Sequence, residues 1–510
     1  MLAAVRSAAV LGIDALDVTV EVDVVPGLPS WTIVGLASSA VREARERVTA
    51  ALANSGFDVP SRRVTVNLSP ADVRKDGTSF DLPIALALLA ATGALDPATL
   101  QGLVVAGELG LDGAIRPIRG AVTLARAASR AHACLVIPAS NVPEAALAGS
   151  ARIAAATTLG ELVTRIRSGA DFSSPVAAPT NSAACTEHGG PDFADVAGQA
   201  AAKRALEIAA AGGHNVLMMG PPGTGKTMLA RRLPGILPPL TEDELLEVVS
   251  IHSVGGLVIP GTIPSRTPPF RAPHHTISLA GLIGGGPGPR PGEVSLAHRG
   301  VLFLDELLEL PRHVLDAMRQ PLEDGRVVIA RAAHAVAFPA RFQLIAAANP
   351  CKCGHAASDD GRCQCSGADI ERYRSRLSGP LADRIDLHVH VGAVEISALG
   401  APSTAERSSA VRGRVSAARD RQRRRYESLG GVRSNAEVPG RWLVEHGGVT
   451  TDARALLGAA AARLGISARG YHRALRVART IADLDSAAEV NSDAVAEALR
   501  YRDATTARGR

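Results

Sequence analysis

The sequence predicts an α/β fold class, with two successive α/β domains and a helical domain at the carboxyl end. Apolar runs typical of strands are followed by stretches with helical spacing in residues 1–168 and again in residues 192–395. Such alternation favours sheets covered by helices over an all-α or all-β protein. At 510 residues the chain is also too long for a single domain with one hydrophobic core, and two to four domains are expected.

The composition limits the class of protein. A formal net charge of +5 permits a polyanionic partner without demanding one. No apolar run reaches the roughly 18 residues that a membrane span needs, and acidic residues appear before a signal-peptide core is complete. We therefore expect a cytoplasmic protein without a membrane partner, in which the six cysteines form no disulfide framework.

Residues 1–168 are predicted to form the first α/β domain. Residues 18–25 and 64–68 alternate between apolar and polar types, as half-buried strands do. Residues 39–54 and 81–92 have the spacing of helices. A strand, a helix, a second strand and a second helix together make an α/β unit.

Two segments of this domain resemble the catalytic region of Lon-type proteases. The run from Lys75 to Ser79 places Ser79 where the Lon nucleophile lies, and residues 107–120 resemble the part that carries the Lon lysine. A Ser-Lys dyad needs an amine to take the serine proton, but residues 121–123 are Ala-Val-Thr. Arg119 is no substitute, because a guanidinium stays protonated. The resemblance implies a Lon-like fold that is inert as a protease.

A linker and a phosphate-binding loop follow. Residues 169–191 are rich in Pro, Ser, Ala and Gly, which is typical of a linker. In the next domain, an apolar strand over 215–219 enters a glycine-rich loop, and a helical stretch leaves it. The loop consists of Gly220, Pro221, Pro222, Gly223, Thr224, Gly225, Lys226 and Thr227.

These residue types point to a bound nucleoside triphosphate. The glycines let backbone N–H groups turn toward phosphates, and the following helix N-terminus adds a positive field. We expect Lys226 to reach the β- and γ-phosphates of ATP and the Thr227 hydroxyl to hold Mg²⁺. The apolar strand 300–304 ends in Asp305, a second Mg²⁺ ligand, and Glu306, a general base for the attacking water. The two half-sites together predict an ATP-hydrolysing enzyme.

Neighbouring segments resemble those of AAA+ ATPases. The run from Asp195 to Gln199 resembles the segment beside the adenine, and the strand 345–348 ending in Asn349 resembles sensor 1. The resemblance implies that Asn349 contacts the γ-phosphate and orients the attacking water. Alternatively, Asn349 only opens the turn that Pro350 continues.

The order of the segments between the two half-sites of the ATP site indicates a particular group within the AAA+ proteins. A segment with His274 and His275 precedes the glycine-rich stretch 281–292. This order resembles the helix-2-insert group of AAA+ proteins, which includes magnesium chelatase subunits and MCM helicases, and most closely the ComM/YifB family, over nearly the whole chain. Residues 323–339 are predicted to form a hairpin with its tip near 331–334, and the resemblance implies that this hairpin faces the pore of a ring. For the two histidines we favour a structural or pore-loop role over a metal role, because adjacent histidines rarely face one ion.

Four cysteines follow Asn349 in the pattern C-x-C-x9-C-x-C. Cys351 and Cys353 form the first pair, and Cys363 and Cys365 form the second. In a cytosolic protein two close pairs indicate a structural Zn²⁺ site. The C-x-C spacing is tighter than usual, so reduced thiols in a loop stay as the alternative.

Residues 374–387 resemble the S-G-P-L-L-D-R-I-D segment of the same family, with Ala382 replacing a leucine. The resemblance identifies Arg384 as an arginine finger that reaches the γ-phosphate of a neighbouring subunit, which its permanent planar charge suits. The working unit would then be a ring. The alternative is a surface arginine paired with Asp383 or Asp386.

The last part, residues 396–510, is predicted to contain a basic helix and a helical lid. Eight arginines lie between 402 and 427, on a solvated helix face or on a surface that contacts the phosphates of nucleic acid. In the helices of 450–500, Arg469 resembles sensor 2, with Arg473 and Arg476 as competitors.

The resemblance implies a homohexameric motor that hydrolyses ATP on DNA. Single-stranded or branched DNA would be bound without sequence preference, and helicase or branch-migration activity would help to integrate incoming strands during transformation. The alternative is a chelatase-type ATPase that remodels a protein partner for metal insertion. ATP-dependent proteolysis is not expected, because the lysine that a Ser-Lys dyad with Ser79 would need is missing.

Overall fold

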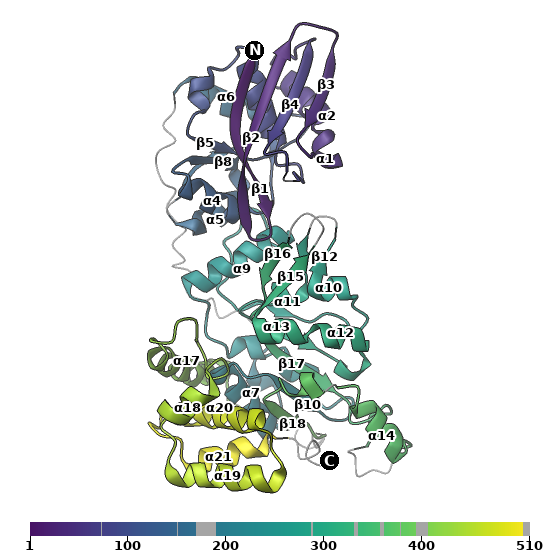
Figure 1. Cartoon of the computed structure of the whole chain (residues 1–510), viewed down its shortest axis with the longest axis vertical. Coiled ribbons are helices and arrows are strands. Elements are labelled where there is room, and N and C mark those ends of the chain that lie inside the picture. The colour runs from purple at the N-terminus through teal and green to yellow at the C-terminus, as the bar shows by residue number, and fades with distance from the viewer. Residues whose placement is uncertain are drawn as a thin grey trace.

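The computed structural model describes residues 1–72, 74–149, 151–169, 190–286, 289–330, 335–356, 362–377, 379–393 and 406–502. An amino-terminal α/β domain lies at one end, a second α/β domain in the middle and a group of helices at the other end (Figure 1). The predicted α/β fold class is confirmed. The domain boundaries near 168, 191 and 395 stay predictions, and most of the linker lies outside the described residues.

A seven-stranded mixed sheet organises the amino-terminal domain in the order β3-β4-β2-β1-β5-β8-β9. Its strands are β1 (Leu2–Leu11), β2 (Asp14–Val25), β3 (Ser30–Val34), β4 (Arg63–Ser69), β5 (Leu103–Val105), β8 (Cys134–Pro138) and β9 (Arg152–Ala156). The other strands, β6 (Glu108–Leu109) and β7 (Ile115–Arg116), form a small separate hairpin. β2 begins earlier than residue 18 because its pairing with β1 continues to the turn at Gly12, which has φ +64°.

The helices of this domain are α1 (Ser39–Arg42), α2 (Ala44–Asn54), α3 (Asp81–Ala91), α4 (Ala121–Arg130), α5 (Val142–Ala145) and α6 (Leu159–Arg167). The predicted helix over 39–54 is therefore two helices that meet at Glu43. Every residue of α3 is buried, including Asp81, whose carboxylate accepts hydrogen bonds of 2.6 and 2.9 Å from Arg47. The ion pair is needed because an unpaired buried carboxylate is costly.

The Lon-like segment holds one lysine that the sequence reasoning did not weigh as a base. Lys75, the single lysine of residues 1–168, is fully buried, and its ammonium donates to the carbonyl of Pro70. Burial lowers the pKa of Lys75. Because its amine is bonded to Pro70, this lysine supplies no evident base for Ser79, and the inert assignment stays a prediction.

A five-stranded parallel sheet organises the second domain in the order β11-β14-β17-β10-β18. Its strands are β10 (Val216–Met219), β11 (Phe270–Arg271), β14 (Val301–Leu304), β17 (Gln343–Ala348) and β18 (Leu387–His390). β14 is apolar and fully buried, and β17 is fully buried with Gln343 as its single polar residue, which is typical of the central strands of a parallel sheet. Since the strands are parallel, the segments that follow β10, β14 and β17 meet at one edge, where open α/β sheets bind ligands.

The helices of this domain are α7 (Ala200–Gly212), α8 (Lys226–Ala230), α9 (Glu242–Gly255), α10 (Leu279–Ile283), α11 (Glu293–Leu296), α12 (Arg312–Ala317), α13 (Arg319–Asp324), α14 (Gly367–Arg374) and α15 (Gly379–Ala382). Two hairpins accompany them: β12 (Gly284–Gly285) with β13 (Arg290–Pro291), and β15 (Arg326–Ala330) with β16 (Ala335–Pro339). The β15–β16 hairpin was predicted, but its tip at 331–334 lies outside the described residues.

The carboxyl-terminal helices are α17 (Ser408–Arg425), α18 (Gly440–His446), α19 (Thr451–Leu464), α20 (Ala468–Leu484) and α21 (Ser492–Arg500). They share one apolar core with the sheet of the second domain, from Val216 and Ile345 to Leu475 and Val495. In the described residues, no helix is both long and apolar enough to cross a membrane.

The two α/β domains touch where α4 meets α9 (Figure 1). Val122 of α4 packs against Leu245, Val248 and Val249 of α9. Beside this apolar contact, the backbone N–H of Gly120 donates to Ser253 Oγ at 2.7 Å. The second domain is therefore held to the first by both apolar packing and a buried hydrogen bond.

Candidate nucleotide-binding site

The phosphate-binding loop lies between β10 and α8, as predicted. Gly223 and Gly225 have φ values of +79° and +87°, which favour glycine. At Gly220 a side chain has no room, because a Cβ atom there would overlap the carbonyl oxygen of Val391 in the neighbouring strand region. The glycines at these positions are therefore required by the backbone path of the loop.

Lys226, Thr227 and Asp305 lie together at the carboxyl edge of the sheet. The Thr227 hydroxyl donates to Asp305 Oδ2 at 2.6 Å, so the two predicted Mg²⁺ ligands are in contact. The ammonium of Lys226 donates to the carbonyls of Gly220 and Pro221 at 2.7 and 2.8 Å. Burial lowers the pKa of Lys226, and the carboxylates of Asp305 and Glu306 oppose that shift.

Asn349 joins this group from the end of β17. Its Oδ1 accepts a hydrogen bond of 3.4 Å from Lys226 Nζ. The side chain therefore faces the loop, as a γ-phosphate contact requires, in addition to preceding the turn at Pro350. Gln199 also reaches the loop, with Nε2 donating to Thr224 O at 3.3 Å and to Gly392 O at 2.7 Å.

Glu306 follows Asp305 in a left-handed conformation, with φ +50°. Its side chain is bound by His275, whose Nδ1 lies 2.9 Å from Glu306 Oε2. Sequence reasoning did not connect these two residues. His275 follows β11, which pairs with β14, the strand that leads into Glu306, and the sequence gives no periodic signal for a strand as short as β11. Among the described residues, the histidines belong to no cluster of three or more possible metal ligands.

The four cysteines converge on a single point. Their sulfur atoms all lie within 4.8 Å of one another, and the Cys351–Cys363 and Cys353–Cys363 distances are 3.8 and 3.7 Å. Four sulfurs at about 2.3 Å from one Zn²⁺ are separated by about 3.8 Å, so the donor set fits this ion. The cluster adjoins the phosphate loop, since a Cβ on Gly354 would lie 2.8 Å from Cδ of Pro222.

Arg384 lies at the opposite edge of the sheet from the loop. Its backbone carbonyl accepts a 2.8 Å hydrogen bond from Asn215, which precedes β10, whereas the loop follows β10. Its guanidinium pairs with Glu323 rather than with Asp383 or Asp386, which bind Arg473 and His214. A single chain therefore does not bring Arg384 to its own phosphate loop.

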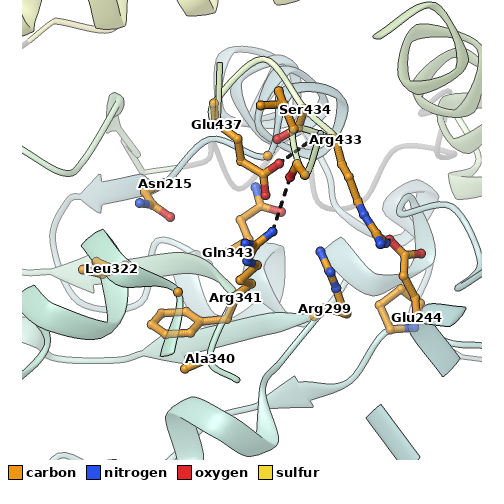
Figure 2. A pocket seen from close by; sticks show the side chains of 18 of the residues that line it. Asn215, Glu244, Arg299, Leu322, Ala340, Arg341, Gln343, Arg433, Ser434 and Glu437 are labelled. Carbon is orange, nitrogen blue, oxygen red and sulfur yellow. Dashed lines mark hydrogen bonds and ion pairs between the residues drawn. The ribbon is translucent and has the colours of Figure 1, made fainter. Parts of the chain in front are cut away.

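Arg384 lines an arginine-rich cavity of about 870 Å³, of which Figure 2 labels Arg299, Arg341 and Arg433. The arginines that line it are Arg299, Arg341, Arg384, Arg419, Arg423, Arg433, Arg473 and Arg476. Arg433 pairs with Glu244 at 2.8 Å, and both are labelled in Figure 2. This edge of the sheet is thus charged and concave.

The sensor 2 candidates on α20 differ in their surroundings. Arg473 is buried and bonded to Asp383 at 3.0 Å, and Arg476 donates to Val438 O at 2.9 Å. Arg469 is exposed in the first turn of the helix. Of the three, Arg469 is the one whose side chain is open to a partner.

Several arginines of the basic helix α17 are bonded to other helices, although Arg414, Arg423 and Arg424 are also exposed to solvent. Arg414 pairs with Glu207 at 2.6 Å and Arg425 pairs with Asp483 at 2.9 Å. Arg419 and Arg421 donate to the carbonyls of Ala210 and Asp483. The predicted continuous surface for phosphates is therefore reduced, because these cations hold α17 against α7 and α20.

Comparisons with known proteins show which family the chain is similar to. Residues 192–399 match the family described as magnesium chelatase, subunit ChlI, residues 20–141 match subunit ChlI of Mg-chelatase, and residues 405–502 match its C-terminal family. The chain is 42% identical over 506 residues to competence protein ComM of Haemophilus influenzae, which covers 98% of this chain and 97% of ComM. It is 43% identical over 504 residues to the uncharacterized protein YifB of Salmonella typhimurium, covering 98% and 97%. The magnesium-chelatase 38 kDa subunit of Rhodobacter capsulatus is 30% identical over 178 residues, 31% of this chain and 50% of that protein.

Proposed function

The chain belongs to the ComM/YifB family of magnesium-chelatase-like AAA+ ATPases, and on that basis we propose that it is an ATP-driven ring motor acting on DNA. The observation that carries the ATPase part is the contact between Thr227 and Asp305 beside Lys226. Thr227 and Asp305 are 78 residues apart in the sequence, and their contact supports the proposal that both are ligands of one Mg²⁺.

The residues at this edge have distinct chemical tasks. Backbone N–H groups of the loop and the ammonium of Lys226 bind the phosphates, while Thr227 and Asp305 are the protein ligands for Mg²⁺. Bound Mg²⁺ would neutralise charge on the phosphates. Glu306 takes a proton from the attacking water, and Asn349 orients that water.

The position of Arg384 supports the proposal of a ring. Since its own phosphate loop is at the far edge of the sheet, Arg384 acts on the nucleotide of a neighbouring subunit. Each subunit then offers a loop at one edge and an arginine finger at the other, an arrangement that closes into a homo-oligomeric ring. We propose a hexamer, with Arg469 contributing as sensor 2.

DNA as the substrate rests on the likeness to ComM, which is named a competence protein. We propose that single-stranded or branched DNA is bound without sequence preference and that ATP hydrolysis drives helicase or branch-migration activity in transformation or recombination. The arginines of α17 give this proposal only limited support, because several of them are bonded to residues of α7 and α20.

The second candidate is an ATPase that remodels a protein partner for metal insertion. It is favoured by the match of residues 192–399 to magnesium chelatase and by the likeness to the 38 kDa subunit. That likeness covers only 31% of the chain, whereas ComM and this chain match almost from end to end. The DNA motor is therefore the better-supported proposal.

We further propose that Cys351, Cys353, Cys363 and Cys365 hold a structural Zn²⁺. The close sulfur distances support it, and the ion would tie the segment after Asn349 against Pro222 of the phosphate loop. All four cysteines belong to one chain, so this site does not depend on assembly of a ring.

The DNA proposal is tested by ATPase and branch-migration assays on the purified chain. Single-stranded or branched DNA should raise the ATPase rate. With ATP and Mg²⁺, the wild type should separate a labelled four-way junction into duplexes by branch migration, and the Glu306→Gln variant should not. ATPase stimulation by a protein partner alone, without effect of DNA, would instead favour the chelatase-type function.

A further inference from the structure

Arg473 of α20 is bonded to the chain on both sides of the proposed arginine finger. Its Nη1 donates to the carbonyl of Ile385 at 2.9 Å and to that of Ala382 at 3.4 Å. Its Nη2 donates to Asp383 Oδ1 at 3.0 Å. Arg384 lies between these acceptors in the sequence, so a single guanidinium holds the residues immediately before and after the finger.

The guanidinium of Arg473 makes these bonds away from solvent. Its side chain is 7% exposed, whereas that of Asp383 is 44% exposed. A buried cation is costly unless its donors are bonded, and α15 ends at Ala382, where the last carbonyls of a helix need donors. Two carbonyls and one carboxylate suit the planar fork of an arginine better than the point charge of a lysine. Arg473 therefore supports residues 382–386, which we call the finger segment.

The finger segment is also held by the residues that precede β10. Asn215 Nδ2 donates to the carbonyl of Arg384 at 2.8 Å, and the carbonyl of Asn215 accepts from the N–H of Asp386 at 3.0 Å. Nδ1 of His214 lies 3.2 Å from Asp386 Oδ2, and its Nε2 lies 2.8 Å from Thr480 Oγ1 of α20. The finger segment therefore lies between α20 and the start of the strand that leads into the phosphate loop.

The side chain of Arg384 is turned toward its own chain. Its Nη1 donates to the carbonyl of Pro380 at 2.6 Å, and its Nη2 pairs with Glu323 of α13. To reach the phosphate of a neighbouring subunit the guanidinium must leave Glu323, whose side chain is 61% exposed, and surface ion pairs of this kind are weak. The direction of the released side chain is then set by its main chain, which Arg473 and Asn215 hold in place.

We propose that Arg473 is a positioning residue for Arg384: it holds the finger segment so that the guanidinium points at the γ-phosphate of the neighbouring subunit. A catalytic arrangement displaced by about 1 Å can lose about 100-fold in rate. Arg473 lies about one turn after Arg469 on α20, so one helix carries both the proposed sensor 2 and the support of the finger. The placement of α20 thereby affects hydrolysis at the next site of the ring. This inference rests on the proposed role of Arg384 between subunits.

The test is steady-state ATP hydrolysis by the full-length chain at saturating Mg²⁺. In Arg473→Met, whose unbranched side chain fills similar space without the donors, kcat should fall roughly 100-fold. KM for ATP and binding of a fluorescent ADP analogue should stay as in the wild type, because the phosphate loop is intact. Arg473→Lys keeps a cation near Asp383 and should have a kcat between those of the wild type and the Met variant.

Mixtures of two variants show at which nucleotide Arg473 acts. Arg473→Met mixed with Lys226→Ala should recover activity, because the intact loop of the first chain meets the intact finger of the second. Arg473→Met mixed with Arg384→Ala should not recover, because neither chain supplies a positioned finger. The reverse pattern would show that Arg473 acts at the nucleotide of its own chain and would overturn the proposal.

A double-mutant cycle separates positioning from direct contact with the phosphate. Asp383→Ala removes one acceptor of Arg473 and should lower kcat, by less than Arg473→Met does. The double variant should be as slow as Arg473→Met alone, because the two residues act through one contact. An unchanged or raised kcat in Asp383→Ala would overturn the positioning role, since an Arg473 freed from Asp383 would then act directly or not at all.

Arg463→Met, which removes an exposed arginine from α19, is the matched control and should leave kcat and KM unchanged. If Arg473→Met fails to bind the ADP analogue, it has not folded, and Arg473→Lys takes its place in both mixtures. A kcat of Arg473→Met equal to that of the wild type, or an Arg473→Lys variant no faster than the Met variant, would overturn the proposal.

The same assays separate this inference from the proposed function. Wild-type turnover by Arg384→Ala would overturn the arginine finger and the role of Arg473 together. An inactive Arg384→Ala beside a fully active Arg473→Met would overturn the role of Arg473 alone. Every comparison is made without DNA, so failure of the proposed DNA substrate would not affect it.

Discussion

The hydroxyl of Thr227 donates a 2.6 Å hydrogen bond to Oδ2 of Asp305, across the gap between the first turn of α8 and the end of β14. Both oxygens are hard ligands of the kind that Mg²⁺ prefers. The contact therefore places the two proposed Mg²⁺ ligands side by side.

Removing the Thr227 hydroxyl should weaken Mg²⁺-dependent ATP hydrolysis. Thr227→Val keeps the shape of the side chain but removes the metal-binding oxygen, so we expect an increase of about tenfold or more in the Mg²⁺ concentration needed for half-maximal rate. Thr227→Ser retains the hydroxyl and is the matched control. A magnesium titration of the ATPase measures both, and equal behaviour of the Val and Ser variants would contradict the metal role.

Arg384→Ala should abolish hydrolysis while leaving ATP binding intact, because Arg384 lies far from its own loop. Lys226→Ala should also be inactive, through loss of phosphate binding. Mixed in equal amounts, the two variants should recover activity at roughly a quarter of the sites, where an intact loop meets an intact arginine. Failure of the mixture to recover, or wild-type turnover by Arg384→Ala alone, would show that Arg384 does not act between subunits.

The cysteine cluster should contain one Zn²⁺ per chain. Elemental analysis of the purified protein measures it, and Cys363→Ser with Cys365→Ser should remove the metal. Because Gly354 contacts Pro222, we also expect weaker ATP binding in that double variant. Cys134→Ser, in β8 of the first domain, is the control and should keep the metal; a wild-type sample free of zinc would contradict the site.

Glu247 should make stability depend on pH in the acid range. Hydrogen bonds from His298 and Arg299, with the charge of Arg299, outweigh burial and lower its pKa from 4.5 to about 2. Burial lowers the pKa of His298, so Arg299 is the lasting cationic partner at neutral pH. A carboxylate whose folded pKa is depressed stabilises the protein above its unfolded pKa, and this stabilisation is lost as pH falls from about 4.5 toward 2.

Glu247→Gln should therefore be less stable than the wild type at pH 7 and should lose less stability between pH 4.5 and 3. Urea denaturation followed by fluorescence measures the midpoints. Glu371→Gln, which changes an exposed glutamate of α14, is the control. Identical pH dependence of the Glu247 variant and the wild type would contradict the ion pair.

The sequence was sufficient for those parts of the site that follow from local chemistry. The loop from Gly220 to Thr227 needs glycines for its backbone path and a lysine for phosphate, and Asp305 and Glu306 end an apolar strand. Parallel strands then force these segments to one edge. The fold class and the family followed from the same local patterns.

The other features of the site and of α17 depend on side-chain directions that the sequence pattern does not specify. The arginines of α17 predicted a basic surface. In the structure, Glu207 pairs with Arg414 and Asp483 pairs with Arg425, and both carboxylates lie on other helices. The contact of His275 with Glu306 required the register of β11 beside β14, and β11 is only two residues long. Such a short strand gives no periodic signal.

The most direct test of the central claim is phosphate release by the purified chain with ATP and Mg²⁺, with and without single-stranded DNA, compared between the wild type and Glu306→Gln. We predict turnover by the wild type and a loss of about 100-fold or more in the variant, which should still bind ATP. Absence of ATP binding and turnover in the wild type, alone and with DNA, would contradict the assignment of this site.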